Sequence, residues 1–108
     1  MGRAHIGELE ELVLLAVAAL QQNAYAVSIR SEIEERAGRK INISAIQASL
    51  YRLDDKGFLT SYMGESTNKR GGKSKRIFEV TKAGYEVLKK AKDIRQSFWG
   101  SIPQFAAE

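Results

Sequence analysis

The sequence predicts a mainly helical α+β fold, and three observations support this class. Apolar residues recur at helical spacing in three segments before Gly57 and again after Val80. Two segments rich in strand-favouring residues, "FLTSYM" and "RIFEV", flank the basic stretch "TNKRGGKSKR", as expected for a hairpin with a basic tip. The 108 residues include a single proline, so few positions interrupt helices. A chain of this length has room for one hydrophobic core, and we expect one domain.

The first two helices are predicted from composition and spacing. Residues 8–22 are good helix formers with glutamates in the first turn, where the helix dipole favours negative charge. After Leu12 this segment is apolar on nearly all sides, so we expect a central, buried helix. A second, amphipathic helix follows Tyr25, with Gly38 placed to end it. Its apolar positions recur at helical spacing: Ala26, Ile29, Ile33 and Ala37.

The third helix is predicted within "INISAIQASLYRLDDKGFL". Asn42 is the expected N-cap, with Ser44 as the alternative, and Gly57 lies where a helix commonly ends. One face is apolar and should pack on the core: Ile43, Ile46, Leu50 and Leu53. At about 100° per residue the opposite face carries a different set: Ser44, Ala48, Tyr51 and Arg52, flanked by Ala45 and Gln47. Near its start this outer face is small and able to form hydrogen bonds.

The last helix is predicted to begin after Thr81, a good N-cap, and to run to about Trp99. Its apolar positions are separated by alternating steps of four and three residues, as in a coiled coil: Val80, Gly84, Val87, Ala91, Ile94 and Phe98. This spacing implies a partner helix. Gly100 and Pro103 should interrupt the pattern, so we expect residues 100–108 to form a loose tail.

Positive charge is concentrated in the middle of the chain. The net charge is +4, but residues 39–76 alone carry nine Lys and Arg against three acidic residues. Such a patch attracts polyanions, because each phosphate contact releases condensed counterions. A solvated basic surface without a ligand is the alternative interpretation.

Enzymatic and metal sites are not predicted. The chain has no cysteine, which excludes disulfides and thiolate metal sites, and its single histidine, His5, is near a terminus. The carboxylate pairs Glu10–Glu11, Glu34–Glu35 and Asp54–Asp55 are sequence neighbours on helices, so the members of each pair point apart. We therefore expect a binding protein without a cofactor rather than an enzyme. The N-terminus lacks the charge order of a signal peptide and "LVLLAVAAL" is too short for a membrane span, so a cytoplasmic location is expected.

The order of these elements is that of a winged helix-turn-helix domain, in which three helices precede a two-stranded wing. Small and polar side chains at the start of the third helix let its backbone approach base edges, and glycines let a basic wing tip follow a neighbouring groove. The expected DNA-binding residues are Asn42, Ser44, Gln47, Ala48, Tyr51 and Arg52 around the third helix and Lys69, Arg70, Gly71, Gly72, Lys73, Lys75 and Arg76 in the wing. The alternative for Tyr51 is an ordinary exposed aromatic, and for Arg52 an ion pair with Asp55 or Glu65.

Four segments, "GELEELVLLAV", "AYAVSIRSEIEERAGR", "SLYRLDDKGFLTS" and "GESTNKRGGKSKRIFEVTKAG", run from Gly7 to Gly84, about three quarters of the chain. Through them the sequence resembles the PadR-type transcriptional regulators of bacteria. The resemblance implies a homodimeric winged-helix repressor that binds a palindromic operator in double-stranded DNA. It also implies that the C-terminal helix makes much of the dimer contact, often together with the first helix. The expected interface residues are Leu12, Val87, Ala91, Ile94 and Phe98.

The resemblance also bears on ligands and on specificity. Drug-binding members of the family imply that a small aromatic or cationic effector binds beside Phe98 and Trp99. The alternative is that these two residues only strengthen the dimer. Gln47 stands where the family usually has a tyrosine, and Tyr25-Ala26 replaces the usual Tyr-Gly. Glutamine can address adenine through two hydrogen bonds, so a shifted operator preference and a loss of binding are both open. The second difference is interpreted as packing.

The expected division of the chain is a DNA-binding domain at 1–80, a dimerisation helix at 81–99 and a tail at 100–108. An alternative function remains, in which a winged-helix module holds an acidic protein partner or RNA through the same basic wing. Only a dimeric operator reader requires two half-sites at a fixed separation. A preference for palindromic duplexes therefore distinguishes the two functions.

Overall fold

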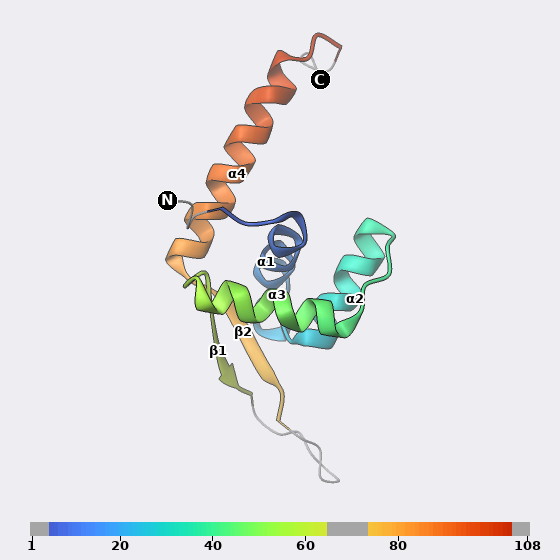
Figure 1. The fold of residues 1–108 in the computed structure, drawn as a ribbon, viewed down its shortest axis with the longest axis vertical. Helices are drawn as coiled ribbons and strands as arrows, with labels where there is room; N and C mark the ends of the chain where they lie inside the picture. Colours follow the sequence, from blue (N-terminus) through green and yellow to red (C-terminus); the bar gives the residue numbers. More distant parts are fainter. Residues whose placement is uncertain (1–4, 65–73, 105–108) are drawn as a thin grey trace.

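A computed structural model describes residues 5–64 and 74–104. Its elements follow in order: α1 (Glu8–Leu20), a 3-10 turn (Gln21–Asn23), α2 (Ala26–Ala37), α3 (Ile43–Asp55), β1 (Leu59–Met63), β2 (Arg76–Val80) and α4 (Lys82–Ser101) (Figure 1). The predicted class is confirmed, because three helices precede a two-stranded wing and a long final helix.

The core forms where α1, α2 and α3 meet. Its largest fully buried side chains include Leu14 of α1, Ile29 of α2 and Ile46 of α3. The expectation that α1 is buried on nearly all sides is wrong, because Leu15 remains 46% exposed and Ala19 is also exposed. One side of α1 therefore faces solvent in this chain.

The helix ends follow from local backbone chemistry. Gly38 ends α2 in the left-handed conformation with φ 67°, which a residue without a Cβ adopts at little cost. Asn42 precedes α3 as predicted, and its backbone carbonyl accepts hydrogen bonds from the N–H groups of Ala45 and Ile46. Beyond α3, Gly57 has φ 85° and turns the chain into β1. Ala37, expected on the core face of α2, is exposed because it lies in the last turn of that helix.

The wing is an antiparallel hairpin in which Leu59 pairs with Val80 and Met63 with Arg76. Its base is attached to the helices by a 2.8 Å hydrogen bond from the N–H of Phe78 to the carbonyl of Ala24, just before α2. From this base the strands extend away from the three helices (Figure 1). This attachment fixes the direction of the wing relative to α2 and α3.

α4 begins on the domain and then leaves it. Thr81 caps the helix by accepting a 3.1 Å hydrogen bond from the N–H of Gly84, and it donates a 2.7 Å hydrogen bond to the carbonyl of Gly57. Val87 and Leu88 are buried, whereas residues 92–101 are exposed and the helix projects from the domain (Figure 1). The prediction that Gly100 interrupts the helix is wrong, since α4 continues to Ser101 before Pro103.

The projection of α4 gives the molecule an elongated outline of 58 × 32 × 21 Å. Within the described residues, none of the helices combines the length and the hydropathy that crossing a bilayer requires.

Candidate nucleic-acid interface

The outer face of α3 presents the side chains that the sequence predicts. Ile46, Leu50 and Leu53 are buried on the inner face of this helix. The opposite side faces solvent, where the exposed residues are Ser44, Gln47, Ala48, Tyr51 and Arg52. Tyr51 is 76% exposed, and Asn42 is exposed just before the helix. These six residues therefore lie along one side of the domain.

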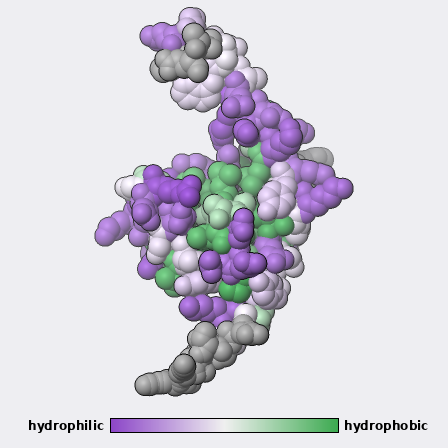
Figure 2. All heavy atoms as spheres, turned by 180° about the vertical axis from the view of Figure 1, so that it is seen from behind, coloured by the Kyte–Doolittle hydropathy of each residue, from purple (hydrophilic) through white to green (hydrophobic). Residues whose placement is uncertain are grey.

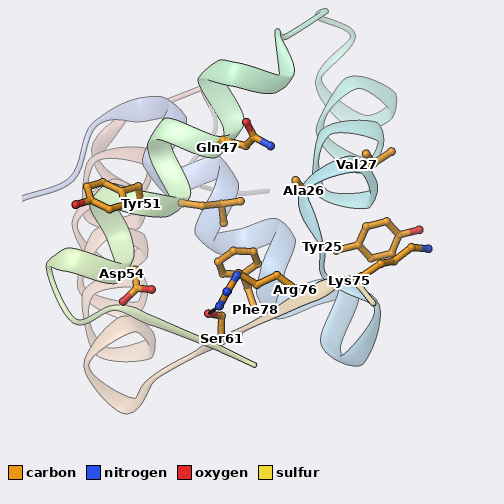
Figure 3. Close-up of a pocket in the computed structure, with 11 residues that line it drawn as sticks. Tyr25, Ala26, Val27, Gln47, Tyr51, Asp54, Ser61, Lys75, Arg76 and Phe78 are labelled. Atoms are coloured by element: carbon orange, nitrogen blue, oxygen red, sulfur yellow. Dashed lines mark hydrogen bonds between the residues drawn. The ribbon is translucent and has the colours of Figure 1, made fainter. Parts of the chain in front are cut away.

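A hollow of about 550 Å³ separates α3 from the wing and the start of α2. Gln47 and Tyr51 border it on the α3 side, whereas Ser61 and Arg76 border it on the wing side (Figure 3). Its walls include the apolar side chain of Phe78. The hollow connects the face of α3 with Lys75 and Arg76, at the start of β2, in one continuous surface, and these two residues are called the root of the wing below.

The root of the wing is held by side-chain contacts. The Nζ of Lys75 lies 4.3 Å from the centroid of the Tyr25 ring, and the Nη1 of Arg76 donates a 3.0 Å hydrogen bond to the Oγ of Ser61. Both cations are exposed, so their charges stay available to an anionic ligand. The other predicted wing residues lie outside the described part of the chain: Lys69, Arg70, Gly71, Gly72 and Lys73.

Tyr25 was not expected at this surface. The sequence shows an aromatic residue at the start of a helix, and such residues commonly pack on a core. In the structure it borders the hollow beneath Lys75, and its backbone N–H donates a 3.0 Å hydrogen bond to the Oγ of Ser28. The signal that could have identified it is a lysine at the base of the predicted wing, since ammonium groups stack on aromatic rings.

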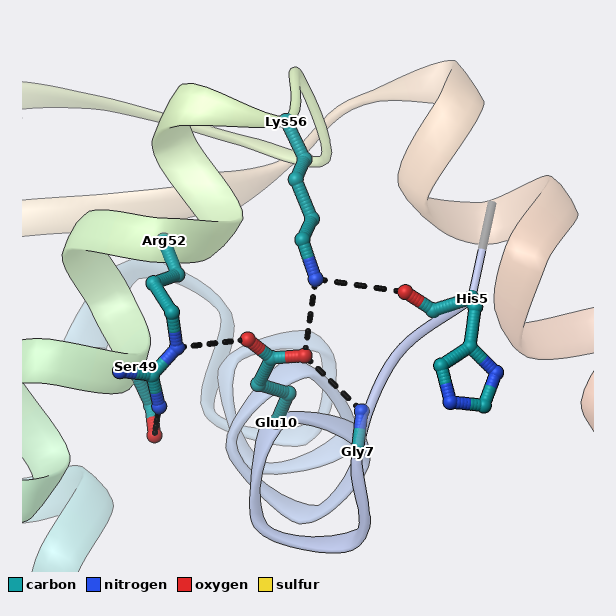
Figure 4. A network of polar contacts seen from close by, with 6 residues as sticks. All are labelled: His5, Gly7, Glu10, Ser49, Arg52 and Lys56. Atoms are coloured by element: carbon teal, nitrogen blue, oxygen red, sulfur yellow. Dashed lines mark hydrogen bonds and ion pairs between the residues drawn. The ribbon is translucent and has the colours of Figure 1, made fainter. Parts of the chain in front are cut away.

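Arg52 forms an ion pair, but with a different partner from those considered as the alternative to DNA contact. Its Nε donates a 2.8 Å hydrogen bond to Glu10 of α1, rather than pairing with Asp55, and Glu65 lies outside the described residues. The same carboxylate accepts hydrogen bonds from the Nζ of Lys56 at 3.0 Å and from the N–H of Gly7 at 2.9 Å (Figure 4). Arg52 is therefore engaged within the fold, although its side chain remains 53% exposed.

Glu10 is a buried carboxylate whose charge is compensated. Burial raises its pKa, but the hydrogen bonds from Gly7, Arg52 and Lys56 outweigh this effect and lower the pKa from 4.5 to about 2. Glu10 is thus ionised at neutral pH, and it fastens the first turn of α1 to the C-terminal half of α3.

The predicted dimer residues divide into two groups. Val87 is 8% exposed and packs in the core of its own chain, because α4 rests on the domain at that point, while Leu12 and Ala91 are partly buried. Ile94 is 53% exposed and Phe98 is 69% exposed. The coiled-coil spacing of α4 therefore continues from an internal contact into an apolar stripe that faces solvent.

Of the two predicted effector residues, only Trp99 borders the hollow between α1 and α4. Trp99 borders an open hollow of about 650 Å³ between α1 and α4, along with Leu15 and Tyr85, whereas Phe98 does not line it. At its edge the Nη2 of Arg95 donates a 2.5 Å hydrogen bond to Glu11, and this hydrogen bond raises the pKa of Arg95 above its ordinary value. The described residues hold no cluster of His, Cys, Asp or Glu suited to a metal ion.

Comparisons with known proteins concern the family and the fold. The sequence profile of the Transcriptional regulator PadR-like family matches residues 14–90. A PadR-like transcription factor from Bacteroides fragilis has a similar structure, with 22% identity, a TM-score of 0.71 and coverage of 89% of this chain and 87% of that one. A PadR family regulator from Clostridium difficile is similar at 20% identity and a TM-score of 0.70, covering 93% of this chain and 99% of that one.

A third similar structure was solved with a ligand. It is Bacillus subtilis PadR in complex with operator DNA, at 23% identity and a TM-score of 0.62, with coverage of 77% of this chain and 45% of that one. No match was found among curated protein sequences.

Proposed function

This chain belongs to the PadR-like family of transcriptional regulators, and from that premise we propose that it binds a palindromic operator in double-stranded DNA as a homodimer. The family is one of regulators and not of enzymes. The observation that carries the proposal is the continuous surface on which the small and polar face of α3 meets the exposed cations at the wing root. A similar fold binds operator DNA in the protein from Bacillus subtilis.

We assign base reading to α3. Ser44 and Ala48 are small and exposed, so the backbone of the helix can approach the floor of a major groove. Gln47 carries both a donor and an acceptor and can pair with adenine, and Tyr51 is 76% exposed beside it on the same face. Arg52 has the smaller role, because Glu10 already holds its guanidinium.

The wing supplies affinity rather than sequence choice. Lys75 and Arg76 are exposed at its root, and three further cations, Lys69, Arg70 and Lys73, precede them in the sequence. Lysine and arginine on such an element suit phosphates or a minor groove, where they position the protein without distinguishing bases strongly.

Homodimer formation is proposed through α4. Ile94 and Phe98 expose an apolar stripe beyond the domain, and a groove of about 240 Å³ bordered by Leu12, Leu15 and Ile33 lies between α1 and α2. Seen from the side opposite to Figure 1, an apolar area lies near the middle of the domain and is surrounded by hydrophilic residues (Figure 2). Pairing of two chains would remove such surfaces from water.

The division of the chain follows from these roles. Residues 1–80 form the proposed DNA-binding domain and residues 81–99 the dimerisation helix, with the remainder as a tail. A small protein that covers an operator excludes other proteins from it, so we propose repression. A small aromatic or cationic effector bound near Trp99 or Phe98 would release the DNA by favouring another separation of the two domains.

Selection of bound duplexes from random DNA tests the proposal. The expected result is an enriched site with two inverted half-sites whose centres are about one helical turn, or a multiple of it, apart. Two results would favour the alternative of an RNA or acidic-protein partner. One is enrichment of duplexes without such symmetry, and the other is equal binding to single-stranded RNA of the same length. A reporter placed behind the selected site then determines whether the regulator represses or activates.

A further inference from the structure

Two adjacent glutamates in the first turn of α1 hold two different helices. Glu10 binds Arg52 and Lys56 and so fixes α1 to α3. Glu11 points to the other side, where its carboxylate accepts hydrogen bonds from the Nη2 of Arg95 at 2.5 Å and from the Nε at 3.4 Å. One turn of α1 therefore joins the DNA-reading helix and the projecting helix.

The contact between Glu11 and Arg95 has a special place along α4. The helix is buried at Val87 and Leu88 and is exposed from residue 92 onward. Among the described residues, the Glu11–Arg95 contact is the one ion pair that joins α4 to another helix. Two hydrogen bonds from a planar guanidinium fix orientation as well as distance. The pair thus restrains the helix just beyond the point where packing on the core ends.

Open space lies on both sides of this pair. The hollow that contains Leu15 and Trp99 and a second hollow of about 230 Å³ near Ile6 and Ile94 both have Glu11 and Arg95 in their walls. Side-chain packing around the pair is therefore incomplete, and the pair adds a restraint on the angle of α4 beyond the packing at Val87 and Leu88.

We propose that Glu11 and Arg95 are positioning residues that set the angle between α4 and the DNA-reading domain, and thereby the half-site separation that the homodimer accepts. The inference rests on the proposed function, since it requires two domains joined through α4. A tilt of about 10° moves a point about 20 Å from the pivot by about 3.5 Å, which is close to the rise of one base pair. A small change in this angle is thus sufficient to change the register of one α3 relative to the other.

The test measures affinity against half-site separation. The operator selected from random DNA is prepared with its half-sites moved together or apart by one and by two base pairs, and binding is measured at one salt concentration. Wild type should show a clear optimum. Glu11→Gln and Arg95→Gln should each reduce the preference for the optimum over its neighbours by about three- to fivefold, the factor that such a pair supplies.

Two controls separate positioning from general damage. The charge swap Glu11→Arg with Arg95→Glu restores opposite charges at the same places and should recover the optimum. Asp93→Asn removes the ion pair with Lys89 within α4 and should leave the profile unchanged. Binding to a single half-site should be equal for all variants, because α3 and the wing are untouched.

Each outcome has a definite meaning. Glu11→Gln and Arg95→Gln proteins that keep the wild-type profile would overturn the positioning role and leave the proposed function standing. If wild type itself binds every separation equally, the dimeric operator reader is wrong and this inference fails with it. Sedimentation of each variant shows whether a changed profile comes from a dimer of altered angle or from dissociated chains, and dissociated chains would also overturn the positioning role.

Discussion

The ammonium of Lys75 lies 4.3 Å from the centroid of the Tyr25 ring, so the root of the wing rests on the residue that precedes α2. A cation held over an aromatic face keeps its charge while losing freedom of orientation. Lys75 is therefore presented toward solvent from a defined position beside the α3 face, and it differs in this respect from a lysine on a free loop.

The cations at the wing root should contribute salt-dependent affinity. Replacing Lys75 and Arg76 with alanine should weaken binding to the operator and to random duplexes nearly equally, and should reduce the slope of log affinity against log salt by about two units. Titrations at several salt concentrations measure both quantities. Lys89→Ala with Lys92→Ala removes the same charge from α4 and should have little effect. An unchanged slope in the Lys75 and Arg76 variant would remove the wing root from the interface.

The side chain at position 47 should determine which bases are preferred. Gln47 is exposed on the outer face of α3, so Gln47→Tyr should leave the fold intact while changing the duplexes that are selected. A change of about 1 to 3 kcal/mol at one preferred base pair is expected if the amide reads it directly. Gln22→Tyr, at an exposed glutamine in the 3-10 turn, is the control. Identical selection by wild type and Gln47→Tyr would exclude this residue from base reading.

Glu10 should make the free energy of unfolding depend on pH. Its folded pKa of about 2 is lower than the ordinary 4.5, so its contribution is complete above about pH 4.5 and is lost as the pH falls to about 2. Glu10→Gln should lower the free energy of unfolding by about 2 to 3 kcal/mol at neutral pH. Urea unfolding at several pH values should show this difference shrinking below pH 4.5. Glu35→Gln, at an exposed position on α2, should show neither effect.

Gly84 permits the close approach of α4 to the turn between α3 and β1. A Cβ at this position would collide with the carbonyl oxygen of Phe58, which is backbone and cannot rotate away. Gly84→Ala should therefore destabilise the protein, by about 1 to 3 kcal/mol. Gly100, in the same helix, has open space around it, and Gly100→Ala should stabilise the helix by up to about 1 kcal/mol. Thermal unfolding measures both, and equal shifts would contradict the close packing at Gly84.

The exposed stripe of α4 should carry dimerisation. Ile94→Asp places a charge on the stripe and should shift sedimentation at micromolar concentration from dimer to monomer. Met63→Asp alters an exposed apolar residue of similar accessibility on β1 and should leave the dimer intact. A wild-type monomer at this concentration would refute the proposed assembly, and a dimeric Ile94→Asp protein would place the interface elsewhere.

Local signals predicted most of the fold. Three helix ends were predicted from single residues: Gly38, Asn42 and Thr81. This was possible because helix capping depends on the residue type at the end of the helix and on its close neighbours in the sequence. The outer face of α3 was predictable for a similar reason, since helical periodicity assigns each side chain to one face. The contact of Arg52 with Glu10 was not, because the two residues are 42 positions apart and their meeting depends on how α1 crosses α3.

The last helix shows a second limit of sequence patterns. Val87 and Ile94 belong to the same heptad-like series, yet the first packs on its own core and the second faces solvent. Apolar spacing indicates that a surface will be covered but does not say which chain covers it. Gly100 also failed as a helix end, because an isolated glycine in an exposed helix costs only about 1 kcal/mol.

The projection of α4 affects how the protein moves through solution. The radius of gyration of 15.9 Å is larger than the roughly 13 Å expected for a compact domain of this length. A single chain should therefore diffuse more slowly and elute earlier from a sizing column than a sphere of 12.0 kDa. Elution volume calibrated on globular standards would overestimate the mass and make a monomer resemble a larger species. Subunit number should accordingly be determined by sedimentation equilibrium or light scattering, which report mass independently of shape.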